Sequence, residues 1–462
     1  MTSFLERARS DIGTPPIAAL QIGARRFSDH RAHAVEAFPP MDDMRDRARA
    51  IRLHTLANLD RYLAQFADAL EGVGGHVFFA ADAHEANEYV VQLAHARNVE
   101  RIVKSKSMLT EELHLNDALE AEGMEVVETD LGELIVQLAN DRPSHIIAPV
   151  LHKTRFEIGT LFEEKLGVPY TDDPIQLNTI ARRHLRPLFL TADMGISGVN
   201  IAVAQTGSIC IVTNEGNGRL TTTAPRIHVA MLGAERLVPS IGDMSVILEV
   251  LARSATGQKL SVYTNVLTGP RRPGEPDGPD ELHVVIVDNG RSKVLAGPSS
   301  EILACIRCGA CLNVCPVYRT VGGHAYGSTY PGPVGSVLTP ALFDLDEWSD
   351  LPYASTLCGA CLEVCPVRID IPRLLLDQRN LSVQTRTGPM WMRRPLRAYA
   401  GAATHPGRFR ALLRAGAVIG RLFRTGWIRR LPWRGAAWTR GRDLQAPVKS
   451  FHRRWKERNR GS

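Results

Sequence analysis

The sequence predicts an α/β protein followed by a small cysteine-rich module, and two observations support this prediction. Between residues 71 and 297, short apolar runs alternate with segments of helical periodicity. That alternation is typical of a parallel β-sheet covered by helices. Seven of the eight cysteines then lie between residues 305 and 365, in two similar motifs. Clustered cysteines of this kind indicate metal ligands, because the cysteines of a disulfide framework would be spread through a short secreted chain.

The chain divides into four regions by composition. Residues 1–70 are expected to be helical, because apolar residues recur at helical spacing in "IRLHTLANLDRYLAQFADAL". The glycine-rich "EGVGG" ends that run, and the α/β domain is expected over residues 71–297. Residues 298–385 carry the cysteine motifs, and residues 386–462 form a basic segment rich in tryptophan. At 462 residues the chain is also too long for one compact core.

Within the α/β domain, the expected strands come in two groups. The first group contains "HVFFAA" (76–81), "RIVKSKSM" (101–108), "EVVET" (125–129) and "HIIAPV" (145–150). The second group contains "GVNIAVAQTGSICIVTN" (198–214), "RIHVAML" (226–232), "KLSVYTNVLTG" (259–269) and "ELHVVIVDNG" (281–290). A tight turn is expected at Gln205–Ser208, where Gly207 supplies a permissive backbone. Asp82, Thr110 and Asp173 are expected to begin helices.

The first cysteine motif predicts an iron–sulfur cluster. The sequence "CIRCGACLNVCP" at residues 305–316 has the C-x2-C-x2-C-x3-C-P spacing of ferredoxins that hold two clusters. In such proteins three sulfurs of a motif bind one cluster, and the fourth binds the neighbouring cluster. We therefore expect the first cluster to be bound by Cys305, Cys308, Cys311 and Cys365.

The second motif, "STLCGACLEVCP" at residues 355–366, is one cysteine short. We expect Cys315, Cys358 and Cys361 to bind the second cluster, and Ser355 stands where its fourth thiolate would be. Three interpretations remain open: a 4Fe-4S cluster with an oxygen or water ligand at one iron, a 3Fe-4S cluster, or a fourth ligand supplied by a partner. Since a serine oxygen binds iron less well than a thiolate does, Ser355 is not assigned as a ligand.

A pair of structural zinc sites is the alternative for these cysteines, because four-cysteine zinc sites also use C-x2-C pairs. The three closely spaced cysteines and the C-x3-C-P ending favour iron and sulfur. Gly309 and Gly359 follow equivalent cysteines, where a small residue allows backbone N–H groups to approach a cluster. Cys210 lies in the apolar "GSICIVTN" and is expected to be a buried core thiol.

Several polar residues of the α/β domain are candidates for anion binding. The turn "NEGNGR" at 214–219 has backbone amides that could hold an anion together with Arg219, but it matches no nucleotide-binding motif. Lys104, Lys106, His145 and His152 could line a crevice at the carboxyl ends of the strands. The competing interpretation is that these are solvated loop charges and packed histidines.

Charge separates the C-terminal segment from the rest of the chain. From Arg386 onward there are 20 Lys and Arg residues against two acidic ones, which leaves 35 basic and 47 acidic residues before it. The segment also holds five of the six tryptophans. We expect it to dock onto an acidic protein partner, with a membrane surface as an alternative and nucleic acid as a less favoured one. The chain starts without an apolar signal sequence and is expected to be cytoplasmic.

Taken together, the chain resembles the lactate utilization protein B family, the iron–sulfur subunit of the L-lactate utilization system. The resemblance rests on the two cysteine motifs and on the stretches "VKSKSM" (103–108), "ETDLGE" (128–133), "PSHIIAPVLHKTR" (143–155), "TGSICIVTNEGNGR" (206–219) and "PDGPDELHVVIVDNGRS" (276–292). It implies a lactate utilization domain similar to sugar-phosphate isomerases and CoA transferases, followed by an α-helical ferredoxin-like module. It also implies two 4Fe-4S clusters, and it makes the three-cysteine second motif a trait of the family.

The resemblance implies an electron carrier in a system that oxidises L-lactate to pyruvate. Its implied partners are a cysteine-rich redox subunit and a small protein built from the lactate utilization domain. In that case the chain is a non-catalytic or co-catalytic redox subunit, and no catalytic residue is assigned. The alternatives are a carrier for another 2-hydroxy-acid oxidase, a CoA or sugar-phosphate enzyme with Glu215 as its candidate carboxylate, and a nucleic-acid-binding cluster protein.

Overall fold

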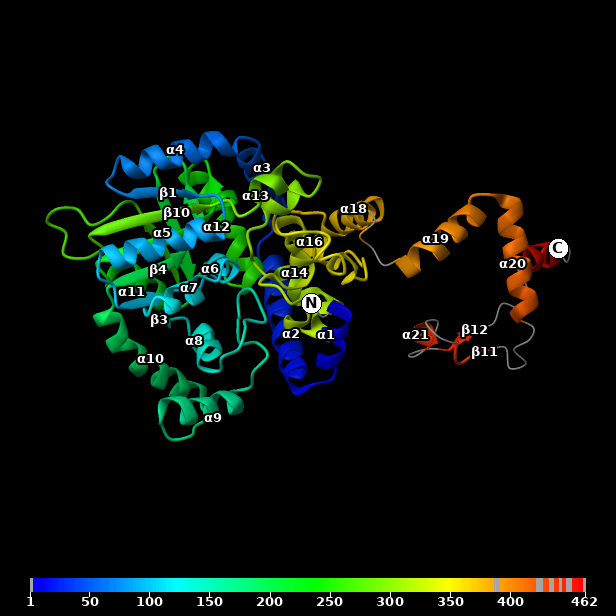
Figure 1. Ribbon diagram of the computed structural model, residues 1–462, viewed down its shortest axis with the longest axis horizontal. Helices are drawn as coiled ribbons and strands as arrows, with labels where there is room; N and C mark the ends of the chain where they lie inside the picture. Colours follow the sequence, from blue (N-terminus) through cyan, green and yellow to red (C-terminus); the bar gives the residue numbers. More distant parts are fainter. Residues whose placement is uncertain are drawn as a thin grey trace. The chain divides into compact units, whose positions relative to one another are not determined.

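The computed structural model describes residues 3–385, 387, 390–420, 427–431, 436–439, 443–445 and 451–459 (Figure 1). They belong to two compact units, Met1–Thr387 and Gly388–Ser462. Both the α/β architecture and the cysteine module lie within the first unit. In the part of the chain that the structure describes, we find no helix with the length and apolar character needed to cross a membrane.

A six-stranded sheet, parallel throughout, forms the centre of the first unit and confirms the predicted fold class. Its strands run in the order β1 (His76–Ala80), β10 (Glu281–Val287), β7 (Ile227–Gly233), β4 (Met194–Gly198), β2 (Arg101–Lys104) and β3 (Glu125–Glu128). All seven residues of β7 are buried. A continuous apolar strand of this kind is what a parallel sheet covered on both faces requires.

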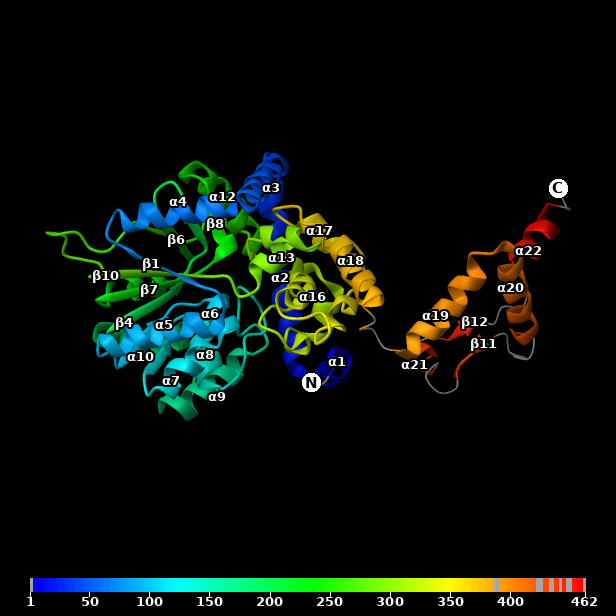
Figure 2. The ribbon, with the colours of Figure 1, turned by 45° about the horizontal axis from the view of Figure 1, so that its top comes forward.

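Helices cover both faces of this sheet (Figure 2). On one face, Leu232 and Ile286 pack in a core cluster with Phe66 of α4 (Leu59–Glu71). On the opposite face, Met231 and Val287 pack with residues of α5 (Ala83–Ala96), α6 (Met108–Leu113) and α7 (Leu115–Ala121). Adjacent residues therefore face opposite layers, as strand geometry demands. The edge near β3 is covered by α8 (Leu131–Leu138), α9 (Arg155–Leu166) and α10 (Pro174–Thr191).

A second sheet of four strands packs beside the first in the order β8 (Leu237–Val238), β5 (Ile201–Val203), β6 (Ser208–Thr213) and β9 (Tyr263–Leu267). The predicted tight turn joins β5 to β6, which pair antiparallel. Gly207 has a φ of 65°, and an added Cβ would lie 2.4 Å from the backbone nitrogen of Leu70. Only glycine satisfies both the positive φ and this close approach.

The expected strand "HIIAPV" is wrong, because residues 145–150 form a loop. The side chain of His145 explains the difference. Its Nδ1 accepts hydrogen bonds from the backbone N–H groups of Ile147 (3.1 Å) and Ala148 (3.2 Å), which a strand would need for its ladder. The Ser144 N–H also donates to the Pro149 carbonyl at 2.9 Å, which closes the loop on itself. Local side-chain hydrogen bonds have replaced the sheet pairing.

The expected N-terminal helices are present as α1 (Phe4–Asp11), α2 (Pro15–Glu36), α3 (Met41–Ala57) and α4. Helices α2 and α3 contact the cysteine module, and Figure 1 shows α2 beside it. That module consists of helical segments: η2 (Ser300–Ala304), α14 (Ala310–Val314), α15 (Pro316–Val321), η3 (His324–Tyr326), α16 (Gly332–Leu342), η4 (Leu351–Tyr353), α17 (Ala360–Val364) and α18 (Ile371–Gln384). The remaining helical elements of the first unit are α11 (Asn217–Thr223), η1 (Ala234–Arg236), α12 (Ile241–Ala255) and α13 (Arg291–Leu295).

The second unit contains the basic segment. Its described elements are α19 (Met390–Ala403), α20 (Pro406–Gly420), β11 (Trp427–Ile428), α21 (Ala436–Thr439), β12 (Leu444–Gln445) and α22 (Phe451–Arg458). Strands β11 and β12 pair antiparallel. Trp427 and Trp455 are 48% and 52% exposed, so both present apolar area at the surface of this unit.

Arg52 of α3 connects the N-terminal helices both to the four-stranded sheet and to the segment before the first cysteine. This buried side chain donates to the carbonyls of Leu237 (2.6 Å), Leu303 (3.0 Å) and Ala304 (3.3 Å), and it also donates to the Glu235 carbonyl. Leu237 begins β8, whereas Leu303 and Ala304 immediately precede the first cysteine. One arginine thus holds three parts of the unit together.

We expect Arg52→Leu to lower the free energy of unfolding by about 3 kcal/mol, because several buried carbonyls would lose their donors. Chemical denaturation measures this change. Arg47→Leu is the matched control, since Arg47 is exposed on the same helix. Equal effects of the two substitutions would contradict the role given to Arg52.

Candidate functional site

The two cysteine motifs adopt the same backbone conformation. Arg307 and Leu357 occupy equivalent positions and have φ values of 59° and 55°. Gly309 and Gly359 are also equivalent, with φ values of 74° and 88°. Each glycine precedes a one-turn helix, α14 in the first motif and α17 in the second. Positive φ at a non-glycine residue is uncommon, so its repetition indicates a common local architecture.

In the first group, Cys308 and Cys365 are buried, and Cys305 and Cys311 are half-buried. Burial and the nearby Cys305 and Cys365 raise the pKa of Cys308 to about 12. Burial also raises the pKa of Cys311, with further contributions from Cys305 and Cys308. The thiols of this group therefore interact electrostatically with one another, and Cys311 also interacts with Cys361 of the second group. Their assignment as ligands of the first cluster remains a prediction.

In the second group, Cys315 and Cys361 are buried and Cys358 is exposed. Burial and the neighbouring Cys315 and Cys358 raise the pKa of Cys361 to about 12. Cys358 is exposed, and hydrogen bonds from the Ala360 N–H and from Thr356 lower its pKa. This site is thus the more accessible of the two. Its assignment as a three-cysteine cluster site also remains a prediction.

The cysteine sulfurs are not gathered closely enough for a site that holds a single metal ion. Among the described residues, which include all eight cysteines, no three cysteine sulfurs lie within 4.8 Å of one another. In a tetrahedral zinc site with Zn–S bonds of about 2.3 Å, the sulfurs would be about 3.8 Å apart. Backbone N–H groups also donate to Cys305 Sγ (3.4 Å, from Arg307) and Cys365 Sγ (3.3 Å, from Ile369). Such donors stabilise the thiolates that an iron–sulfur cluster requires.

Ser355 occupies the position in the second motif that Cys305 occupies in the first motif. Its Oγ accepts a hydrogen bond from the Leu357 N–H at 3.1 Å. In the first motif, Cys305 Sγ accepts the equivalent bond from the Arg307 N–H. Ser355 therefore presents an oxygen where the first motif presents a sulfur.

Arginines of α3 bind the carbonyls of the second motif. Arg45 donates from Nη2 to the Glu363 carbonyl (2.7 Å) and from Nε to the Cys365 carbonyl (3.0 Å). Arg49 donates to the Arg368 carbonyl at 2.6 Å. This role of Arg45 and Arg49 was not predicted from the sequence. The arginines at positions 45, 49 and 52 recur at helical spacing, and this was the available signal.

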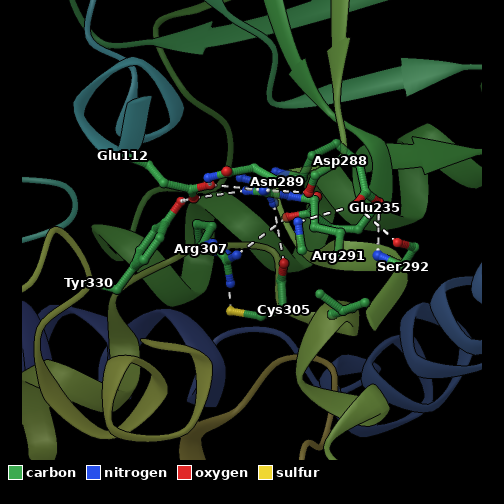
Figure 3. Close-up of polar contacts among 12 residues, drawn as sticks. Glu112, Glu235, Asp288, Asn289, Arg291, Ser292, Cys305, Arg307 and Tyr330 are labelled. Carbon is green, nitrogen blue, oxygen red and sulfur yellow. Dashed lines mark hydrogen bonds and ion pairs between the residues drawn. The ribbon is translucent and has the colours of Figure 1, made fainter. Parts of the chain in front are cut away.

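A buried chain of charges connects the sheet to the first cysteine loop (Figure 3). Arg291 donates two hydrogen bonds of 2.9 Å to Glu112 and one of 2.6 Å to Glu235. Arg307 donates to the other oxygen of Glu235 at 3.3 Å, and its guanidinium lies 4.8 Å from the ring centre of Tyr330. The Tyr330 hydroxyl donates to Glu112 at 2.5 Å, so Tyr330 contacts both ends of this series of charges.

The arginines keep the carboxylates of this chain ionised. Burial alone disfavours the charge on Glu235, but Arg291 and Arg307 outweigh burial and lower its pKa to about 2. Glu112 behaves in the same way, since Arg291 lowers its pKa against the effect of burial. The carboxylates of Glu112 and Glu235 and the guanidinium groups of Arg291 and Arg307 are therefore all charged at neutral pH.

The other polar candidates separate into buried packing residues and one cavity residue. Lys104 is fully buried and pairs with Glu128 at 2.7 Å, so it does not line a crevice. His145 and His152 are also buried, and His145 Nε2 bonds Asn313 Oδ1 at 2.9 Å. The competing interpretation of packed histidines was right for His145 and His152, whereas Lys104 is neither a crevice residue nor a solvated loop charge, because it is buried in an ion pair. Lys106 lines a cavity at the carboxyl edge of the sheet.

The exposure of Arg219 and Cys210 decides between the roles expected for them from the sequence. Arg219 is exposed, and it is not among the residues that line the cavity. Cys210 is fully buried in β6, as expected of a core thiol, and burial raises its pKa to about 12.

Glu215 also lines this cavity, where its Oε2 accepts the Leu131 N–H at 3.2 Å. Burial, followed by the charge of Asp130, raises its pKa to about 7, while Lys106 acts in the opposite direction. The cavity thus contains a carboxyl group that changes its charge near neutral pH.

Comparison with known protein families shows which domains the chain contains. Residues 63–287 match the family described as the LUD domain, and residues 301–369 match the 4Fe-4S dicluster domain. The chain is thus a LUD domain joined to an iron–sulfur dicluster domain.

Curated relatives match nearly the whole length of the chain. Lactate utilization protein B of Bacillus licheniformis is 46% identical, covering 96% of this chain and 93% of the relative. Its Bacillus subtilis counterpart is 45% identical, covering 98% and 95%. A protein of Escherichia coli named "Uncharacterized electron transport protein YkgF" is 43% identical, covering 98% and 96%. The chain belongs to the lactate utilization protein B family.

The raised pKa of Glu215 predicts a pH dependence of stability. The folded chain holds this proton up to about pH 7, whereas the unfolded chain loses it near the ordinary value of 4.5. Stability therefore falls as the pH rises through this window. We expect Glu215→Gln to remove about 1–3 kcal/mol of that fall, measured by denaturation at pH 5 and pH 8. The control is Glu163→Gln at an exposed site, and identical pH profiles for both variants and the parent would contradict the expectation.

Proposed function

We propose that the chain is the iron–sulfur electron-transfer protein of a system that oxidises L-lactate to pyruvate. The match to a 4Fe-4S dicluster domain supports electron transfer, and the names of the relatives support lactate utilization. The observation that carries the proposal is the repeated loop architecture that gathers seven thiols in two neighbouring groups.

The cofactors of the proposal are two 4Fe-4S clusters. Such a cluster, when bound, accepts and donates one electron at a time. The first ligand set is Cys305, Cys308, Cys311 and Cys365, and the second is Cys315, Cys358 and Cys361. The buried Arg236 and Arg307 interact with Cys305 of the first set, whereas the second set reaches the surface through Cys358. This difference favours the second site as the one that exchanges electrons with a partner.

We propose that the domains divide at the boundaries expected from the sequence. Residues 71–297 form the lactate utilization domain, and residues 298–385 form the iron–sulfur module. The helical segment over residues 1–70 supports the cysteine loops through Arg45 and Arg49.

Residues 386–462 are proposed to dock onto partners of the same system. The candidates are a cysteine-rich redox subunit and a small protein built from the lactate utilization domain. The segment has 18 more basic than acidic residues, and the exposed Trp427 and Trp455 add apolar contact area. An acidic protein surface complements this combination better than solvent does.

Cysteine substitution tests the cofactor assignment. The anaerobically purified parent is expected to contain about eight irons and eight sulfides per chain and to be reduced by dithionite. Cys308→Ala is expected to lose the first cluster, so that about half of the iron remains. Cys210→Ala, at a thiol outside both sets, serves as the control and retains the full iron content. Zinc in place of iron, or an iron content that Cys308→Ala leaves unchanged, would refute the assignment.

Ser355→Cys tests the incomplete second motif. Because Ser355 occupies the position of Cys305, a thiol there is expected to complete the second set. The expected result is an altered electron paramagnetic resonance signal of the reduced protein and iron loss in air that is several-fold slower. Glu347→Cys places a thiol at an exposed position outside the motif and is expected to change neither property. If both substitutions act alike, Ser355 does not mark a ligand position.

A further inference from the structure

A cavity of about 400 Å³ lies at the carboxyl edge of the parallel sheet. Its walls include Lys106 after β2, Glu215 after β6 and Arg236 after β7. Ile306 and Arg307, which lie between the first two cysteines, complete the wall on the side of the iron–sulfur module. Open parallel sheets bind their ligands at this edge, so the position is that of a ligand site.

Several donors in this wall lack acceptors. Lys106 Nζ, Ser105 Oγ and Arg307 Nη1 are buried, and none of these atoms has a hydrogen-bond partner among the described residues. The side chain of Arg307 is only 6% exposed, and Ser105 is 4% exposed. An unsatisfied buried donor costs about 1–3 kcal/mol, and more when it is charged. Their presence in one cavity predicts a ligand that brings acceptor oxygens.

The charge of Lys106 remains available to such a ligand. The carboxylate oxygen paired with it belongs to Glu133 and lies 3.9 Å away, beyond hydrogen-bonding distance. Burial raises the pKa of Glu133 to about 8, so this group is largely protonated at neutral pH. Lys106 can therefore form a short, charge-assisted bond with an anion.

Glu215 provides the complementary acceptor. Both side chains line the same cavity, and the charge of Lys106 acts on Glu215 by opposing the burial that raises the pKa of this carboxyl group. A cation beside a carboxyl group matches a ligand that carries a carboxylate and a hydroxyl on adjacent carbons. A plain monocarboxylate would satisfy only the cation.

We propose that this cavity binds the anion of a small 2-hydroxy acid, with its carboxylate on Lys106 and its hydroxyl facing Glu215. Ser105 and Arg307 supply further donors to the bound oxygens. The inference rests on the proposed function, since that function selects L-lactate as the probe. It adds that the lactate utilization domain of this chain itself holds the substrate class.

The site also touches the first cysteine loop. Arg307 lines the cavity through its side chain, while its backbone N–H donates to Cys305 Sγ at 3.4 Å. Arg236, on the same wall, donates to the Cys305 carbonyl at 3.2 Å. A ligand in the cavity is therefore expected to change the spectrum of a cluster bound at Cys305.

The test is calorimetric titration of the anaerobic, cluster-loaded full chain with L-lactate, propionate and inorganic phosphate. We expect L-lactate to bind, propionate to bind more weakly, and Lys106→Gln to weaken L-lactate binding at least about tenfold. Lys106→Arg is expected to restore most of the affinity because it restores the charge. Lys165→Gln, at an exposed site on α9, is the matched control and is expected to bind as the parent does.

Iron content and reduction by dithionite are measured on every sample, so that two failures can be told apart. Normal clusters without L-lactate binding, or binding that Lys106→Gln leaves unchanged, would overturn the inference and leave the proposed function standing. Phosphate binding more tightly than L-lactate would also overturn it. Lysine-dependent L-lactate binding by a chain without a reducible cluster would support the site and overturn the proposed function.

Discussion

The buried chain of Glu112, Arg291, Glu235 and Arg307 is the constraint on which the first unit depends. Its members come from four separate segments, and Arg307 belongs to the loop between the first two cysteines. Buried charges carry a large desolvation cost, and losing one partner leaves the other uncompensated at a cost of about 3–5 kcal/mol. The sheet and the cysteine loop must therefore form together, because neither part satisfies these charges alone.

The same buried charged residues determine the electrostatic potential at the proposed first cluster. Arg236 and Arg307 are buried and interact electrostatically with Cys305. Glu112 and Glu235 are neutralised by Arg291 and by Arg307 itself, so the carboxylates do not cancel the positive charge from Arg236. Positive charge near a thiolate-bound cluster favours its reduced form. The second site has an exposed cysteine, so the two sites differ in environment, as a directional relay requires.

The sequence predicted those parts that depend on local patterns. Cysteine spacing identified both motifs and the anomaly at Ser355, and apolar runs identified the parallel strands. Contacts between distant residues were not predictable in this way. Arg291 and Glu112 are far apart in the chain and share no motif, and Lys104 resembles a loop cation although it is buried against Glu128. The loop at His145 was missed because its own side chain, rather than a strand neighbour, satisfies the backbone. The cavity likewise depends on tertiary placement, since Lys106, Glu215 and Arg307 meet only after folding.

The most direct test of this account is diffraction from anaerobically grown crystals at the iron absorption edge, because it locates the metal and its protein ligands together. We expect two iron clusters within one chain. One would be bound by Cys305, Cys308, Cys311 and Cys365, with Arg307 beside it, and the other by Cys315, Cys358 and Cys361, with Ser355 at the position of the missing thiolate. Single ions bound by four cysteines, or iron away from these thiols, would show that the two cysteine motifs do not hold iron–sulfur clusters.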